Sequence, residues 1–249
     1  TVYNGTLTGV YEDGDPVSSS VLDLDDLDYA DEFIYHIVDN TDEGNVTWTN
    51  NTTGAYQFDP GGDFQNLIYG ATRDVTFTYY TENQNETPSQ SNIATITITV
   101  TGVNDDPLAY DYNDDTTENQ PIDDGQVDPA TDDDTDDGQG NTEIYEVNPN
   151  GYALVSPSSP LNCPLGPPDN ETLESCGTLV FDPDGSYTFD PELDFDYLTE
   201  EESTTVTFEY TASDNSPDPN QAQTGLSDPK TVTIQINGQD DSTTAYNGT

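Results

Sequence analysis

The stretch GAYQFDPGGDFQNLIYGATRDVTFTYYTEN (residues 54–83) aligns without a gap on GSYTFDPELDFDYLTEEESTTVTFEYTASD (residues 185–214). Self-similarity of this kind identifies a structural unit that occurs more than once in a chain. The residues that coincide are mostly large and apolar. They are the pairs Tyr56 and Tyr187, Phe58 and Phe189, Pro60 and Pro191, Phe64 and Phe195, Leu67 and Leu198, Phe77 and Phe208, and Tyr79 and Tyr210. The chain therefore contains two copies of one fold.

Each copy then ends on a second shared pattern, ATITITVTGVNDD (residues 94–106) and KTVTIQINGQDD (residues 230–241). Apolar residues alternate with Thr, Gln or Asn in both, which predicts a strand with one buried face. Short strands separated by clusters of Gly, Pro, Asn and Asp indicate an all-β sandwich of about seven strands in each copy. We expect two tandem immunoglobulin-like, Greek-key β-sandwich domains, over residues 1–106 and 107–241.

A short motif marks where the copies begin. The chain opens on TVYNGT and closes on TTAYNGT, and AYDYND (residues 109–114) stands at the corresponding place after the first copy. We therefore expect residues 242–249 to begin a further repeat or to join another subunit. Copies of the chain itself are the expected partners, through head-to-tail repetition or through strand addition between filament subunits.

Acidic residues dominate the charge of the chain. There are 51 Asp and Glu residues against one Lys and one Arg, and the formal net charge is −49. Nucleic acid is excluded as a partner because phosphate binding depends on Lys and Arg, and anionic membranes are excluded likewise. Membrane insertion is not expected, since no apolar run approaches the roughly 18 residues of a membrane span. Self-repulsion on this scale must be neutralised by cations from solution.

Cysteines and glycosylation motifs predict an extracellular location. The only two cysteines, Cys163 and Cys176, close a short loop in a Pro-rich insertion (residues 156–177), which predicts a local disulfide. The alternative, a metal or redox pair, lacks histidine and the CxxC spacing. Asn-x-Ser/Thr motifs provide possible glycosylation sites. These are Asn4, Asn45, Asn50, Asn51, Asn85, Asn170 and Asn247.

Several acidic motifs resemble those of a known family. The run ENQPIDDGQVDPATDDDTDDGQGNTEIYEV (residues 118–147) resembles the start of a cadherin-type repeat, and residues 12–38 carry a weaker version. VNDDP (residues 103–107) resembles the linker between such repeats. Residues 177–214 resemble the cadherin-like VCBS repeats of large bacterial surface adhesins. The resemblance covers most of both copies and implies an acidic calcium-binding linker between the two domains.

Calcium is the cofactor that the resemblance implies, and it prefers the oxygen ligands that Asp, Glu and Asn supply. Carried over by motif, the ligands between the copies are Glu12, Asn104, Asp105, Asp106, Asp134, Asp136, Asn141 and Asp214. A second junction would combine Glu118, Asp240 and Asp241 with Asp26 and Asp28 of whatever repeat follows. The sequence departs from the family within DDDTDD, where Asp132 or Asp133 could replace Asp134, and a D-R-E motif is missing, although Asp63 lies near its place.

The alternative for any single carboxylate is a solvated face on a salt-adapted protein. The linker cluster as a group favours an ion, because like charges concentrated at one hinge are unfavourable without a counterion. A helix-loop-helix calcium hand does not fit this sequence. Taking Asp133 as its first position places Gly138 correctly at the sixth but Ile144 at the twelfth, where Glu is needed.

Catalysis is not expected from this sequence. The only histidine, His36, lies in the alternating stretch FIYHIV and is expected on a strand at a sheet margin. Paired carboxylates are not a specific signal of glycoside hydrolysis in a chain with 51 acidic residues. The predicted function is an extracellular structural repeat protein, either the calcium-stiffened stalk of a surface adhesin or the subunit of a filament. The alternative is a cell-surface module that recognises glycans or proteins through residues 156–177.

Overall fold

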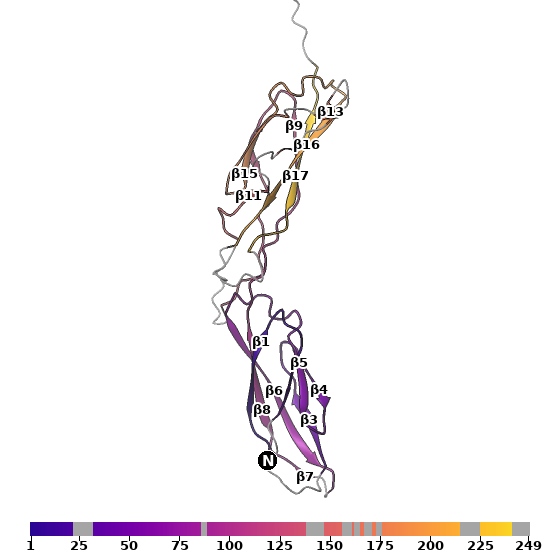
Figure 1. The fold of residues 1–249 in the computed structure, drawn as a ribbon, viewed down its shortest axis with the longest axis vertical. Helices are drawn as coiled ribbons and strands as arrows, with labels where there is room; N and C mark the ends of the chain where they lie inside the picture. The colour runs from indigo at the N-terminus through magenta and orange to yellow at the C-terminus, as the bar shows by residue number, and fades with distance from the viewer. Residues whose placement is uncertain are drawn as a thin grey trace, which may run out of the picture. The chain divides into compact units, whose positions relative to one another are not determined.

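A computed structural model describes residues 1–21, 32–85, 89–137, 147–155, 161, 165–166, 171–172, 176–214 and 225–240. The regular elements in these ranges are β-strands, and none of these residues forms a helix long and apolar enough to cross a membrane. The chain divides into two compact units (Figure 1). Unit 1 holds Thr1–Asp105 and the described part of Asp133–Glu146, whereas unit 2 holds Asp106–Asp132 and the described parts of Val147–Asn215 and Gln223–Thr249.

Unit 1 is a sandwich of two sheets around one core. The first sheet has the order β1-β8-β6-β3 with the short β7 beside β6, and the second has the order β2-β5-β4. β1 runs parallel to β8, and the other neighbours are antiparallel. The strands are β1 (Gly5–Tyr11), β2 (Val17–Ser20), β3 (Phe33–Asp39), β4 (Asn45–Asn50), β5 (Ala55–Asp59), β6 (Thr72–Asn83), β7 (Ser89–Gln90) and β8 (Ala94–Thr101).

Unit 2 has the same arrangement. Its sheets have the orders β9-β17-β16-β11 and β10-β15-β14, and β9 runs parallel to β17. A separate pair, β12 with β13, lies within the Pro-rich insertion. The strands are β9 (Tyr112–Thr117), β10 (Ile122–Gln126), β11 (Ala153–Leu154), β12 (Leu165–Gly166), β13 (Glu171–Thr172), β14 (Thr178–Phe181), β15 (Ser186–Asp190), β16 (Ser203–Thr211) and β17 (Lys230–Asn237).

The main sheets of the two units correspond strand by strand. In chain order, β1, β2, β3, β4, β5, β6 and β8 have the same places as β9, β10, β11, β14, β15, β16 and β17. In unit 1 the connections from β1 to β2, β2 to β3, β3 to β4 and β5 to β6 cross between the two sheets, as in a Greek-key sandwich. The fold class predicted from the sequence, two tandem all-β sandwiches, is confirmed.

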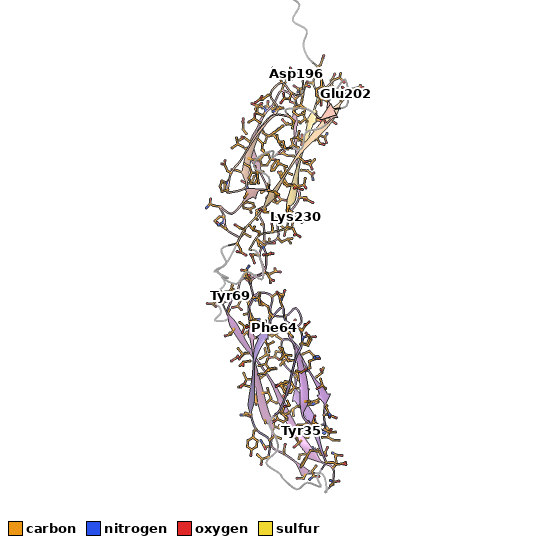
Figure 2. All side chains as sticks on the ribbon, in the orientation of Figure 1. Tyr35, Phe64, Tyr69, Asp196, Glu202 and Lys230 are labelled. Carbon is orange, nitrogen blue, oxygen red and sulfur yellow. The ribbon has the colours of Figure 1, made fainter. Side chains whose placement is uncertain are left out.

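The aromatic residues shared by the two repeated stretches form the centre of each core. Alternation along β6 and β16 turns one face of each strand inward, so that every second residue is buried. Burying one such ring contributes about 2 kcal/mol. Phe64, one of these shared rings, and Tyr35, a further core ring of unit 1, are labelled in Figure 2. The shared rings, each at most 1% exposed, are Tyr56, Phe58, Phe64, Phe77 and Tyr79 in unit 1 and Tyr187, Phe189, Phe195, Phe208 and Tyr210 in unit 2.

The short motif that begins each unit is held in the same way twice. The Tyr79 hydroxyl donates a 2.9 Å hydrogen bond to the carbonyl of Tyr3. In unit 2 the Tyr210 hydroxyl donates a 2.7 Å hydrogen bond to the carbonyl of Tyr110. The third copy of the motif lies in residues 242–249, outside the described residues, and its role stays a prediction.

Candidate metal centre

A carboxylate is buried where the first strand of unit 1 ends. The Glu12 N–H donates a 3.2 Å hydrogen bond to the Thr101 carbonyl, because β1 runs parallel to β8 and the two strands end side by side. Glu12 is only 2% exposed. Its Oε1 accepts a 2.5 Å hydrogen bond from the Val103 N–H, whereas its Oε2 is buried and has no hydrogen-bond partner within the described ranges.

A glycine allows the chain to pass this point. Gly102 lies against the backbone of the loop before β6, where its N–H donates to the Ala71 carbonyl. A Cβ at Gly102 would collide with the Ile68 carbonyl. The absence of a side chain therefore lets residues 103–105 turn back over the Glu12 carboxylate.

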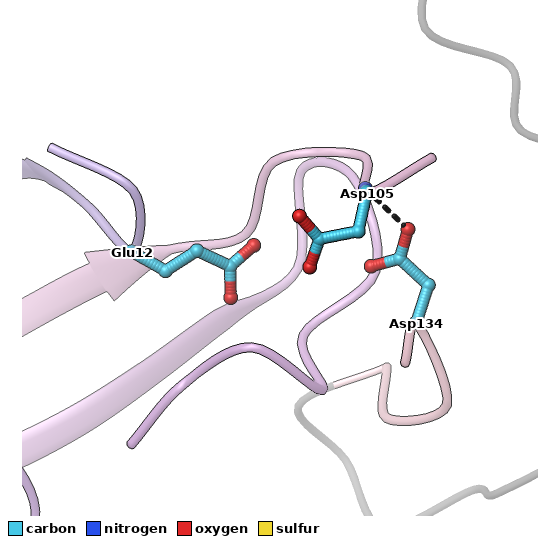
Figure 3. A group of neighbouring side chains, drawn as sticks. All are labelled: Glu12, Asp105 and Asp134. Carbon is cyan, nitrogen blue, oxygen red and sulfur yellow. Dashed lines mark hydrogen bonds between the residues drawn. The ribbon is translucent and has the colours of Figure 1, made fainter. Parts of the chain in front are cut away.

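Two aspartates complete an acidic cluster with Glu12. The Asp105 N–H donates a 2.9 Å hydrogen bond to Asp134 Oδ2, and Asp134 is 1% exposed. One oxygen from each of the three carboxylates lies within 4.8 Å of the others. Figure 3 shows the three groups pointing toward one another. All three residues belong to unit 1.

The environment of Glu12 disfavours its charged form. Its pKa rises from 4.5 to about 8. Desolvation by burial is the largest cause, the hydrogen bond from Val103 opposes it, and the charges of Asp105 and Asp134 raise the pKa further. The cluster without a cation therefore keeps a proton on Glu12 at neutral pH, and a bound cation would favour release of that proton.

Asp134 reaches the cluster because its segment packs on unit 1. The N–H groups of Thr135 and Asp136 both donate to the Asn66 carbonyl, at 3.1 Å and 2.7 Å. The Ile68 N–H in turn donates a 3.0 Å hydrogen bond to the Asp136 carbonyl. Unit 1 thus contains Asp105 and then, after 27 residues that belong to unit 2, the segment that starts at Asp133.

The chemistry of the cluster fits calcium. Calcium is a hard cation that takes six to eight oxygen ligands from carboxylates, carbonyls and water. Glu12, Asp105 and Asp134 offer only oxygen, and the buried Oε2 of Glu12 has no hydrogen-bond partner among the residues that the structure describes. A buried carboxylate oxygen without a hydrogen bond is costly unless a cation or proton satisfies it. The residues present therefore fit a calcium ion held by these three side chains.

The other predicted ligands of this junction have different surroundings. Asn104 is buried beside the cluster, and its Nδ2 donates to the Asp105 carbonyl. Asp136 Oδ2 lies 2.6 Å from Arg73 Nη2, outside the three-carboxylate cluster. Asp106 and Asp214 belong to unit 2, where Asp106 Oδ1 accepts a 2.7 Å hydrogen bond from the Gly225 N–H. Asn141 lies outside the described residues.

Glu118 in unit 2 repeats the surroundings of Glu12. Its N–H donates to the Asn237 carbonyl, its Oε1 accepts a 2.8 Å hydrogen bond from the Gln239 N–H, and it is 0% exposed. Its Oε2 is buried and has no hydrogen-bond partner in the part of the chain that the structure describes. Asp240 is exposed, while Asp241, Asp26 and Asp28 lie outside the described residues. The second predicted junction stays a prediction.

Sequence reasoning missed the role of the only arginine. Arg73 contacts Asp136 and Glu43, and nothing in its local sequence on β6 indicates either partner. The available signal was that Arg73 is one of only two Lys or Arg residues in the chain. Asp63, near the place of the missing D-R-E motif, accepts a 2.8 Å hydrogen bond from the Gly44 N–H instead of joining the cluster.

The remaining predicted residues lie away from the cluster. His36 is on β3, an edge strand as predicted, with its ring stacked on Tyr80 at 4.9 Å. Cys176 is buried and disulfide-bonded, but its predicted partner Cys163 lies outside the described residues. Most of the 156–177 insertion lies outside them as well. Of the glycosylation motifs, Asn170 and Asn247 are not described, and Asn4, Asn45, Asn50, Asn51 and Asn85 are exposed.

Comparison with known proteins gives likenesses in structure only. No protein-family model and no curated protein matches the chain. The chain is similar to mouse cadherin-23 EC22-24, with 18% identity, 95% of this chain and 63% of that chain covered, and a TM-score of 0.47. It is also similar to Drosophila N-cadherin EC1-4, with 17% identity, 96% of this chain and 50% of that chain covered, and a TM-score of 0.47. A third similar structure is human protocadherin-24 EC1-2, with 16% identity, 94% of each chain covered, and a TM-score of 0.42. These neighbours are cadherin ectodomain repeats.

Proposed function

We propose that the chain is an extracellular structural repeat protein whose β-sandwiches are stiffened by calcium. It would serve as the stalk of a VCBS-type surface adhesin or as the subunit of a self-assembling filament. The observation that carries this proposal is the buried cluster of Glu12, Asp105 and Asp134, in which one carboxylate oxygen of a 2% exposed side chain has no hydrogen-bond partner within the described ranges.

The positions of the three carboxylates in the chain explain what binding would do. Glu12 follows the first strand of unit 1, Asp105 follows the last, and Asp134 comes from the segment beyond residues 106–132 of unit 2. A calcium ion would supply the positive charge that lets all three side chains ionise at one point. An ion that holds the three side chains together would fix Asp105 and Asp134, which precede and follow residues 106–132 in the chain. It would thereby restrain the motion of unit 2.

Repetition would extend this effect along a longer assembly. Glu118 has the same backbone partners in unit 2 as Glu12 has in unit 1, so the end of unit 2 offers the first ligand of a second site. Another copy of the unit, covalently joined or from another subunit, would supply the rest. Tandem units that contact only their neighbours add length in proportion to their number. Exposed glycosylation motifs and the net charge of −49 suit an extracellular, salt-rich setting.

Calcium titration of the wild-type chain and a Glu12→Gln variant tests the proposal. The titration is run by calorimetry at high ionic strength, which screens non-specific binding to the acidic surface. We expect a specific site whose affinity falls by at least about tenfold in Glu12→Gln, because a buried charged ligand is lost. The exposed Glu201→Gln variant removes the same charge and should bind as the wild type does.

Solution scattering then tests the mechanical part. For the wild-type chain, the distribution of maximum particle dimensions should be narrower in calcium than in chelator. The Glu12→Gln variant should require more calcium for the same change. Calcium binding that is absent, or equally weak in the wild type and Glu12→Gln, contradicts the metal site. Binding without any change in scattering contradicts the stiffening.

A further inference from the structure

We propose that Arg73 is a positioning residue that holds the segment 133–137 on unit 1 whether or not a metal is bound. The inference rests on the proposed function for its purpose, which is to present Asp134 to the cluster. It also assigns Asp136 a role other than the metal ligand that the sequence predicted. Asp136 would act as the counterion of Arg73.

The contacts of Arg73 are those of a clamp. Its Nη2 lies 2.6 Å from Asp136 Oδ2 and 3.1 Å from Asn66 Oδ1, and its Nη1 lies 2.8 Å from Glu43 Oε1. The guanidinium carbon is 5.8 Å from the centre of the Phe64 ring. Only 20% of the Arg73 side chain is exposed. A planar guanidinium is suited to hold several oxygens in fixed directions, and its bonds to carboxylates are the stronger kind.

The clamp acts on the residues that position Asp134. Asn66, which Arg73 contacts by its side chain, accepts the N–H groups of Thr135 and Asp136 on its carbonyl. Asp136 is therefore held by its backbone and by its carboxylate, two residues after Asp134. Fixing these points limits the directions in which the short Asp133–Thr135 stretch can place the Asp134 side chain.

Charge supports the same assignment for Asp136. The chain has one arginine among 51 acidic residues, and this arginine pairs with Asp136 at 2.6 Å. A carboxylate that already has a fixed cationic partner gains less from a second cation. In unit 2 the repeat alignment places Thr204 at the position of Arg73, so the clamp is a feature of unit 1 alone.

Amide hydrogen exchange in chelator tests the clamp without reference to calcium. In Arg73→Gln, the amides of Ile68 and Asp136, which form the backbone bonds to the segment, should exchange about tenfold faster than in the wild type. Lys230→Gln removes the only other basic residue, which begins β17 in unit 2 and is labelled in Figure 2. It should leave both amides unchanged. Arg73→Lys keeps the charge without the planar group and should give an intermediate rate.

A double-mutant cycle on calcium affinity tests whether Arg73 and Asp136 act as one pair. Arg73→Gln and Asp136→Asn should each weaken calcium binding by about tenfold, and the double variant by no more than about tenfold, because both remove one interaction. If Arg73 and Asp136 act separately, the losses multiply to about a hundredfold and the assignment is overturned.

The two measurements keep the clamp and the proposed function distinguishable. Unchanged exchange at Ile68 and Asp136 in Arg73→Gln overturns the clamp even where calcium binds the wild type. Faster exchange in a chain that binds no calcium supports the clamp and contradicts the proposed function. Should Arg73→Gln fail to fold, Arg73→Lys and Asp136→Asn supply the same comparison.

Discussion

The two units share a sandwich but differ in the loop before their longest hairpin. In unit 1 the Ile68 N–H of this loop donates to the Asp136 carbonyl of the packed segment. In unit 2 the corresponding N–H, that of Thr199, donates a 3.0 Å hydrogen bond to Oε2 of the nearby Glu202, which is labelled in Figure 2. The loop of unit 1 thus forms a hydrogen bond to a separate segment, whereas the loop of unit 2 forms the corresponding hydrogen bond to its own Glu202.

This difference shows where a repeated fold allows specialisation. The buried rings of the two repeated stretches are matched residue by residue, because a change there would leave a cavity or a strained ring. The loops lie outside the core and need only satisfy their backbone groups. A neighbouring side chain or a packed segment does this equally well, so the two units can differ at this edge without a cost to their cores.

Truncating a core ring gives the largest effect and tests whether the units are independent. Phe77→Ala should destabilise unit 1, and Phe208→Ala should destabilise unit 2, each by about 3–5 kcal/mol, because both rings are fully buried. Calorimetry or residue-resolved hydrogen exchange would follow the two transitions. A single transition that shifts in both variants would show that the units unfold together. Leu193→Ala, at a residue 76% exposed, is the control and should change little.

The raised pKa of Glu12 predicts that, in chelator, the free energy of unfolding depends on pH differently in the wild type and in the Glu12→Gln variant. The folded pKa of about 8 is above the unfolded value of 4.5, so the folded state binds the proton more tightly. The stabilisation from this proton is fully present below about pH 4.5 and is lost as pH rises through about 8. The upper limit of this stabilisation is about 5 kcal/mol. Denaturant unfolding of both proteins at pH 5 to 9 measures this stabilisation. Parallel plots of the unfolding free energy against pH would contradict the prediction.

Removing one hydroxyl from each unit should give the smallest effect. Tyr79→Phe and Tyr210→Phe delete the hydrogen bonds to the carbonyls of Tyr3 and Tyr110. Each should destabilise its own unit by about 1 kcal/mol, since a hydrogen bond to a neutral carbonyl is lost and the ring still fits. Equal losses in matched denaturant titrations would show that both units hold their first segment alike. A loss in only one would break the correspondence.

The core and part of the acidic cluster could be read from the sequence because their signals are local. Alternation of apolar and polar residues predicts a buried strand face, and the gapless repeat indicates which rings share it. Glu12 directly follows β1 and Asp105 lies in the loop after β8, and the resemblance of their motifs to a cadherin-type repeat predicts that they meet. The match of Asp134 within DDDTDD was ambiguous, and Asp134 lies in the cluster because Thr135 and Asp136 pack on Asn66.

Other features depend on residues far apart in the chain. Arg73 and Asp136 are separated by 63 positions, and no period or motif links them. Asp106 was grouped with the linker ligands, but its carboxylate accepts the N–H of Gly225 in unit 2. Carboxylates are abundant enough here that composition alone cannot distinguish those that meet from those that face solvent.

By itself, the sequence determined two matched all-β units, their core rings and a large excess of negative charge, because these follow from periodicity and composition. Only the tertiary structure decided that one carboxylate oxygen from each of Glu12, Asp105 and Asp134 lies within 4.8 Å of the others. It also decided that Glu12 keeps a buried oxygen without a hydrogen-bond partner among the described residues. The physical reason is that desolvation and charge repulsion depend on distance and burial. Neither is specified until the loops have packed.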